Sequence, residues 1–169
     1  MFSFEYRRSP DQDRNAPTHV PAIVVGAGPV GLTLALDLAG RGVPVVLLDD
    51  ADRIGEGSRA ICFAKRTLEI FDRLGVAEPM VAKGVIWQKG RVFREKSPVF
   101  AFDLLPEGGH KMPAFINLQQ YYVEKFLIEA AGRCASLDLR WRNKVTTFAL
   151  DADSARVSVA TPEGPYDMT

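Results

Sequence analysis

The residues with the clearest chemical potential are three glycines and one aspartate. Gly26, Gly28 and Gly31 form a GxGxxG turn directly after a short apolar run, and Asp49 follows a second apolar run 18 residues after the last glycine. Such a turn lets the backbone approach a pyrophosphate, and the unpaired N–H groups of a following helix attract its negative charge. The Asp49 carboxylate can accept hydrogen bonds from both hydroxyls of a ribose and would repel a 2′-phosphate. This pattern indicates binding of a dinucleotide other than NADP.

A strand–helix–strand unit must hold these residues in place. The apolar runs at residues 22–25 and 45–48 are typical of strands that are buried on both faces. Between them, residues 30–39 carry apolar side chains at helical spacing beside a polar row spaced by four. A GxGxxG turn alone is weak evidence, but together with both strands, the helix and the terminal acid it is strong. The alternative is a βαβ unit that binds no nucleotide.

Composition favours a soluble globular domain. The 21 basic and 21 acidic residues cancel, so the chain has no general attraction for nucleic acid or anionic membranes. No apolar run approaches the length of a membrane span, and the beginning of the sequence lacks the pattern of a secretory signal. Two cysteines and two histidines give neither a disulfide framework nor a convincing metal site. We expect a cytoplasmic protein without a bound metal.

Hydrophobic periodicity predicts an α/β fold in which a β-rich insertion interrupts a Rossmann-like domain with a parallel sheet. The further elements expected are a helix at about 64–74, short strands at 85–87, 91–93 and 99–102, a helix at about 119–134, a strand at 137–141 that joins the parallel sheet, a hairpin of 144–150 and 155–160, and a turn-like end at 161–169. The parts expected are a flexible N-terminal arm (1–20), the βαβ unit with the following helix (21–75), the insertion (76–118) and a return to the first domain (119–169).

Two further side chains are candidates for contact with a dinucleotide. Arg59 ends a glycine-rich loop on the side where the dinucleotide should lie, and its guanidinium could pair with the pyrophosphate. Gln120 begins a predicted helix after an extended lead-in and could bond a polar part of the cofactor. The alternatives are a solvated loop arginine and an ordinary helix-start glutamine. The aromatic residues of the insertion could line an apolar substrate pocket or simply form core. We nominate no catalytic residue, because no convincing nucleophile–base pair is present.

Three stretches together resemble the class A FAD-dependent aromatic hydroxylases, which are flavoprotein monooxygenases of the para-hydroxybenzoate hydroxylase fold. They are residues 23–49, the run GSRAICFAKRTLEIFDRLG at 57–75 and the run LQQYYVEKFLIEAA at 118–131. The likeness covers nearly everything from Pro21 onward, and it implies that the βαβ unit binds the ADP half of FAD.

The resemblance also implies roles for individual residues. The glycine turn would carry the FAD pyrophosphate, Asp49 would bind the adenosine ribose in place of the more usual glutamate, Arg59 would contact FAD, and Gln120, four residues before Glu124, would bond the ribityl region. The complete set of expected cofactor contacts is Gly26, Gly28, Pro29, Val30, Gly31, Asp49, Asp50, Arg59 and Gln120.

The activity that the resemblance implies is hydroxylation of a phenol-like aromatic substrate. FAD is reduced by NADH or NADPH and reacts with O₂ to form a C4a-hydroperoxide that delivers the oxygen. The alternatives are an NAD-binding oxidoreductase and a non-catalytic FAD-binding fragment.

Two later fingerprints of the family, an Asp-Gly and a Gly-Asp motif, do not occur in the 169 residues. We therefore expect the N-terminal part of a longer enzyme, inactive by itself. Apolar strand faces left open by a truncated sheet favour a homo-oligomer, and a monodisperse monomer in light scattering would count against it.

Overall fold

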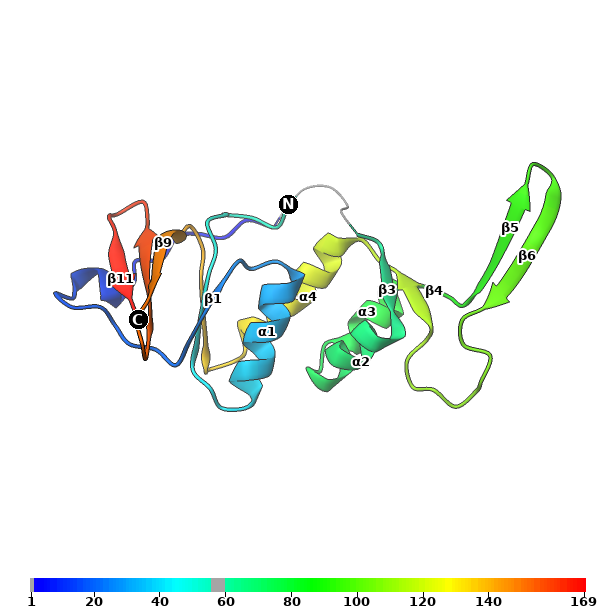
Figure 1. Ribbon diagram of the computed structural model, residues 1–169, viewed down its shortest axis with the longest axis horizontal. Helices are drawn as coiled ribbons and strands as arrows, with labels where there is room; N and C mark the ends of the chain where they lie inside the picture. Colours follow the sequence, from blue (N-terminus) through cyan, green and yellow to red (C-terminus); the bar gives the residue numbers. More distant parts are fainter. Residues whose placement is uncertain (1, 56–59) are drawn as a thin grey trace. The chain divides into compact units, whose positions relative to one another are not determined.

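The computed structural model of the protein describes residues 2–55 and 60–169 (Figure 1). The chain forms two compact units, which are described separately. The first unit consists of Met1–Glu56 and Glu124–Thr169, and the second consists of Gly57–Val123. No helix in the described ranges is long and apolar enough to cross a membrane.

A three-stranded parallel sheet forms the centre of the first unit. Its order is β1 (Ala22–Val25), β2 (Val45–Leu48) and β8 (Leu137–Arg140), and helix α1 (Pro29–Gly40) connects the first two strands. All four residues of the central strand β2 are buried, which explains its uninterrupted apolar sequence. The predicted βαβ unit is confirmed, and so is the predicted addition of a further strand to the parallel sheet, although this strand ends at Arg140 and not at Trp141.

A second, antiparallel sheet in this unit has the order β11 (Tyr166–Met168), β10 (Ala155–Ala160) and β9 (Lys144–Leu150). The predicted hairpin is confirmed, but the prediction of a turn-like end was wrong because Tyr166 and Met168 form a strand. Their buried side chains join a core cluster with Val46 and Leu48 of β2. Three residues are too short a run for their alternation to stand out in the sequence.

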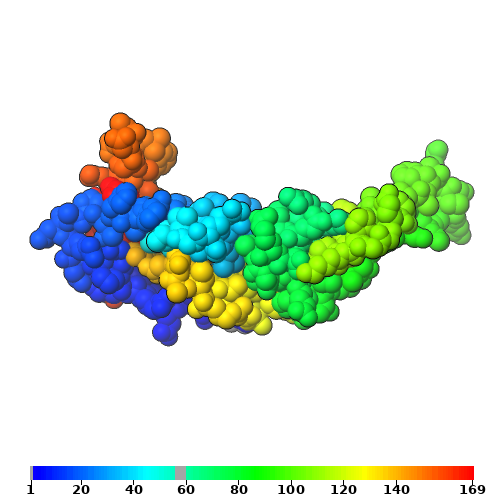
Figure 2. All heavy atoms as spheres, turned by 90° about the horizontal axis from the view of Figure 1, so that it is seen from below, coloured from blue at the N-terminus to red at the C-terminus, as the bar shows by residue number. Residues whose placement is uncertain are grey.

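The tip of the β9–β10 hairpin carries exposed apolar side chains. Figure 2 shows this part, in orange, projecting from the first unit. The side chains of Phe148 and Leu150 are 74% and 75% exposed.

The second unit contains an antiparallel sheet in the order β3 (Cys62–Ala64), β7 (Phe115–Asn117) and β4 (Val85–Trp87), and a separate hairpin of β5 (Lys89–Arg94) and β6 (Ser97–Asp103). Its helices are α2 (Lys65–Arg73) and α3 (Ala77–Lys83), while α4 (Gln120–Ala131) includes the point where the chain returns to the first unit. The three predicted strands are present. The sequence did not predict α3, because Pro79 obscures a helical pattern although proline is tolerated in a first turn. The aromatic side chains of β6 are exposed, so they form no core within this unit.

The N-terminal segment, residues 2–18, makes defined contacts with the rest of the first unit. It contains the 3₁₀ helix η1 (Pro10–Asp13), which Ser9 caps. The Asp11 carboxylate is 7% exposed and accepts a hydrogen bond of 2.6 Å from the Thr18 hydroxyl. The flexibility predicted for residues 1–20 stays a prediction, but the contacts of this segment differ from those of a loose arm.

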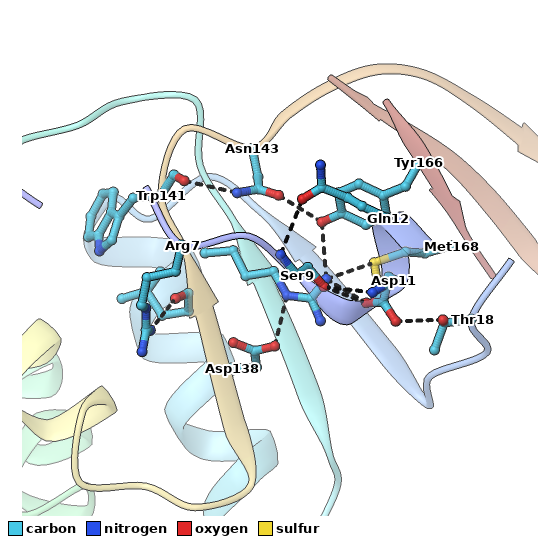
Figure 3. A network of polar contacts seen from close by, with 12 residues as sticks. Arg7, Ser9, Asp11, Gln12, Thr18, Asp138, Trp141, Asn143, Tyr166 and Met168 are labelled. Carbon is cyan, nitrogen blue, oxygen red and sulfur yellow. Dashed lines mark hydrogen bonds and ion pairs between the residues drawn. The ribbon is translucent and has the colours of Figure 1, made fainter. Parts of the chain in front are cut away.

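Arg140, the last residue of β8, is the centre of a buried polar network (Figure 3). Its guanidinium forms ion pairs with Asp11 and Asp138, each at 2.7 Å, and donates a hydrogen bond of 3.1 Å to the Tyr166 hydroxyl. The Tyr166 hydroxyl in turn donates to the side-chain oxygen of Asn143 at 2.7 Å. The network therefore joins η1, β8 and β11 through three side chains that have little access to solvent.

The Asp11 carboxylate should make stability depend on pH. Burial by itself would raise its pKa, but hydrogen bonds from Thr18 and Arg140 together hold the pKa below the ordinary value. A lowered folded-state pKa means that the stabilisation is complete above the unfolded pKa and is lost as the pH falls through the folded pKa. The loss should therefore occur below about pH 4.

We expect Asp11→Asn to lower the free energy of unfolding by about 2 kcal/mol at pH 7 and by much less at pH 3. Urea denaturation at both pH values measures this difference. Asp13→Asn is the matched control, because Asp13 lies on the same 3₁₀ helix and pairs with Arg8 at the exposed surface. If Asp11→Asn lowered the free energy of unfolding equally at pH 7 and pH 3, the role given to the carboxylate would be contradicted.

Candidate cofactor site

The glycine turn begins where β1 ends. Gly26 has a φ of 98°, in the left-handed region that favours glycine, and its N–H donates to the Leu48 carbonyl at 2.8 Å. This bond continues the pairing of β1 with β2 beyond the last strand residue. The turn thus starts at a fixed position at the carboxyl ends of the parallel strands, which is where open α/β sheets bind their ligands.

Gly28 and the first turn of α1 form the part of the site that fits a phosphate. Gly28 is the N-cap residue, and no described side chain caps the helix, which leaves the first N–H groups for another acceptor. A Cβ built on Gly28 would meet no atom within 4 Å. Pro29 is the first helical residue, and the Val30 side chain is 83% exposed. Open space beside unpaired donors and the positive end of the helix dipole suits a pyrophosphate.

Gly31 lies where α1 approaches β1 most closely. A Cβ at this position would collide with the carbonyl oxygen of Gly26 and would lie 3.4 Å from a side-chain methyl group of Val24. Only glycine therefore allows this distance between the helix and the strand. The third glycine of the motif has a packing task, whereas the second leaves space for a ligand.

Asp49, directly after β2, ties the glycine turn to the next loop. Its Oδ2 accepts a hydrogen bond of 2.5 Å from the Ala27 N–H, and its Oδ1 accepts one of 2.8 Å from the Ala51 N–H. Each carboxylate oxygen still has capacity for a further donor, such as a ribose hydroxyl. The contact with ribose stays a prediction, while the structural task of the carboxylate is a feature that sequence reasoning missed.

A hollow of about 180 Å³ opens beside Asp49, and we call it the carboxyl-end hollow. Its lining residues are Val25, Gly26, Leu48, Asp49, Asp50, Asn143, Lys144 and Val145. Asn143 and Lys144 were not among the expected site residues. The sequence feature that could have indicated them is the polar run directly after the third parallel strand. Residues that follow parallel strands lie at the same edge of the sheet, where ligands bind.

The expected site residues do not all lie in this region. The structure brings together Gly26, Gly28, Pro29, Val30, Gly31, Asp49 and Asp50 in the first unit. Arg59 lies outside the described residues. Gln120 is the first residue of α4 and belongs to the second unit, so its contact with a cofactor stays a prediction.

We expect Asp49→Ala to lower the free energy of unfolding by about 2 kcal/mol, because two backbone N–H groups would lose a charged acceptor. Asp50→Ala is the matched control, since its exposed neighbouring carboxylate forms none of these bonds, and it should change stability by less than about 0.5 kcal/mol. Urea denaturation of both variants tests this difference. Equal losses would show that the two bonds to Ala27 and Ala51 do not stabilise the fold.

Comparison with known proteins decides the family. A model of a family described as an FAD binding domain matches residues 19–166. The chain belongs to this family. Its homologues are class A flavin-dependent aromatic hydroxylases, and the glycine turn, Asp49 and the carboxyl-end hollow all fall within the matched range.

The similar proteins are much longer than this chain. A 3-(3-hydroxy-phenyl)propionate/3-hydroxycinnamic acid hydroxylase from Mycolicibacterium smegmatis is 28% identical over 91% of the chain, which covers 27% of that protein. A para-nitrophenol 4-monooxygenase from a Pseudomonas species is 25% identical over 82% of the chain, which covers 34% of that protein. The chain thus spans about a third or less of the length of these relatives.

Solved structures agree with this assignment. The p-nitrophenol 4-monooxygenase PnpA from Pseudomonas putida matches with a TM-score of 0.82 and 25% identity, covering 90% of this chain and 39% of that one. The flavin-dependent monooxygenase PieE, solved in complex with FAD and substrate, matches with a TM-score of 0.76 and 25% identity, covering 90% of this chain and 29% of that one. The α/β fold of this chain is the fold of the FAD-dependent monooxygenases.

Proposed function

We propose that this chain binds FAD through the ADP half of the cofactor. The pyrophosphate would lie against the first turn of α1 beside Gly28, and the adenosine ribose would lie at Asp49, near the carboxyl-end hollow. Asp50 and the other expected residues of the first unit adjoin this path. Contacts of Arg59 and Gln120 with FAD are expected from the resemblance to the family.

The observation that carries the proposal is the contrast between Gly28 and Gly31. A Cβ at Gly28 meets open space beside an uncapped helix, whereas a Cβ at Gly31 collides with the backbone of the turn. Close packing alone would explain the glycine at position 31 but not the glycine at position 28. A glycine that borders open space at a helix N-terminus fits close approach by a phosphate group.

We further propose that the chain is the FAD-binding part of an NAD(P)H-dependent flavoprotein monooxygenase that hydroxylates a phenol-like aromatic substrate. The relatives named above support this reaction class, and this chain spans about a third or less of their length. Bound FAD would supply electron transfer from NADH or NADPH and oxygen transfer from O₂. The residues described here would bind the cofactor and hold its phosphates and ribose in place.

A competition experiment tests the proposed binding mode. FAD bound to the chain should show a higher fluorescence anisotropy than free FAD, and ADP should displace it because both ligands share the pyrophosphate and the ribose. A 2′-phosphate should weaken displacement by about tenfold or more, because it would face the Asp49 carboxylate. The matched competitors are 5′-AMP and adenosine 2′,5′-bisphosphate, which differ only in that phosphate. Equal displacement by 5′-AMP and adenosine 2′,5′-bisphosphate would contradict the role of Asp49. Binding of NAD but not of FAD would overturn the proposed function.

A further inference from the structure

The N-terminal segment contacts the loop after β2 and the turn after β8, two parts of the chain that also contain residues lining the carboxyl-end hollow. The segment itself lies before the matched residues 19–166. One wall of the hollow is the loop that begins with Asp49 and Asp50, and the other is the turn through Asn143 that follows β8. The N-terminal segment itself, residues 2–18, contributes no residue to the lining of this hollow. Its contacts show which part of the site it can influence.

The first contact is a short antiparallel pairing with the loop after β2. Ser3 forms a β-bridge with Arg53, the Phe4 N–H donates to the Asp52 carbonyl at 2.6 Å, and the Ile54 N–H donates to the Phe2 carbonyl at 3.2 Å. The Phe4 ring also stacks on Trp141, with ring centroids 4.3 Å apart and planes at 7°. One short stretch of the segment therefore holds both the loop after β2 and the turn after β8.

The second contact is the polar network around Arg140. The Asp11 carboxylate fixes one side of the guanidinium, which donates to Tyr166, which in turn donates to the Asn143 side chain. Asn143 is 1% exposed, and its side-chain N–H donates to the Trp141 carbonyl at 2.9 Å. An unbroken chain of hydrogen bonds thus runs from η1 to a residue that lines the carboxyl-end hollow.

The two walls are bonded to each other as well as to the N-terminal segment. The Asn143 N–H donates to the Asp49 carbonyl at 2.8 Å, and the Arg142 N–H donates to the Ala51 carbonyl at 3.0 Å. A shift of the turn at Asn143 would therefore move the residue whose carboxylate holds the glycine turn. Packed and hydrogen-bonded elements of this kind transmit small displacements between sites.

We propose that the N-terminal segment positions the nucleotide end of the FAD site, and that Asp11 is a positioning residue acting through Arg140, Tyr166 and Asn143. This inference rests on the proposed FAD binding. Without the Asp11 charge, Arg140 keeps its ion pair with the half-exposed Asp138. The remaining ion pair with Asp138 would then pull the guanidinium away from Tyr166. The hydrogen bonds from Arg140 to Tyr166 and from Tyr166 to Asn143, which hold the turn at Asn143, would weaken.

The test compares Asp11→Asn with Asp13→Asn in the full chain, at a temperature where circular dichroism shows both variants to be folded. We expect the Kd for FAD to rise about fivefold in Asp11→Asn and less than twofold in Asp13→Asn. A purely global loss of stability would leave the Kd of the folded molecules unchanged. Equal Kd values for the two variants would overturn the proposal.

Phe4→Leu provides a second variant if Asp11→Asn does not fold. It removes the stacking on Trp141 and leaves the network at Arg140 intact, and it should also weaken FAD binding. An unchanged Kd in Phe4→Leu would contradict the positioning role of the segment.

Amide hydrogen exchange separates this inference from the proposed function, because it needs no ligand. In the ligand-free chain, the N–H groups of Asn143 and Ala27 should exchange faster in Asp11→Asn than in Asp13→Asn. Faster exchange combined with no FAD binding by the wild type would refute the proposed function and retain the link from the segment to the hollow. Unchanged exchange would overturn the inference whether or not FAD binds.

Discussion

Replacement of Gly28 by aspartate is expected to abolish FAD binding without unfolding the chain. The new carboxylate would occupy the space in which the pyrophosphate is proposed to lie, and juxtaposed like charges cost several kcal/mol. The Kd should rise by about 100-fold or more. The backbone conformation, with a φ of −77° and a ψ of −179°, is available to any residue, and a Cβ has room.

The same substitution should leave stability unchanged or raise it. Aspartate is a favoured N-cap residue, whereas the N-cap of α1 is now a glycine without a side-chain bond. We expect the free energy of unfolding to change by between zero and about +1 kcal/mol. Opposite effects on binding and stability distinguish a ligand site from a structural one.

Gly28→Ala is the control without charge, and it should reduce affinity much less. FAD titration and urea denaturation measure both properties, and full FAD binding by Gly28→Asp would exclude the proposed pyrophosphate position.

Gly31→Ala is expected to damage the fold itself. A single methyl group would collide with the Gly26 carbonyl, so α1 would have to move away from β1 or the turn would have to change shape. The cost is that of an overpacked core, about 3 kcal/mol. The turn is also the proposed phosphate site, so FAD affinity should fall together with stability.

Gly40→Ala is the matched control for this second prediction. It places the same methyl group on the same helix, at a position where a Cβ meets no atom within 4 Å. Alanine has the higher helix propensity, so this variant should be neutral or slightly stabilising. Thermal and urea unfolding of both variants give the comparison. An equally stable Gly31→Ala would show that α1 and β1 are not held as close as the structure indicates.

The βαβ unit could be predicted because its signals are local. Two uninterrupted apolar runs, the glycine turn and the acid after the second strand all lie within residues 22–49. Their roles follow from backbone geometry that short spacings determine. The addition of β8 to the sheet was also predictable, since a helix followed by an alternating apolar run is the usual pattern of an α/β domain.

The elements that were missed depend on contacts distant in sequence. Tyr166 and Met168 become a strand because they complete a core with Val46 and Leu48. Hydrogen bonds with Tyr166 and Asp49 hold Asn143 in position, and these three residues come from three separate segments of the chain. The spacing of residues within a single segment cannot predict such long-range contacts. The N-terminal segment is the clearest example, because its polar composition gives no sign of the ion pair between Asp11 and Arg140.

A visible absorption spectrum of the purified chain tests the central claim, FAD binding by these residues, most directly. The chain is mixed with FAD and desalted, and the spectrum is recorded for the wild type and for Gly28→Asp. We predict retained flavin absorption bands in the wild type and their loss in the folded variant. A wild-type chain that is folded but loses all flavin on desalting would contradict the account.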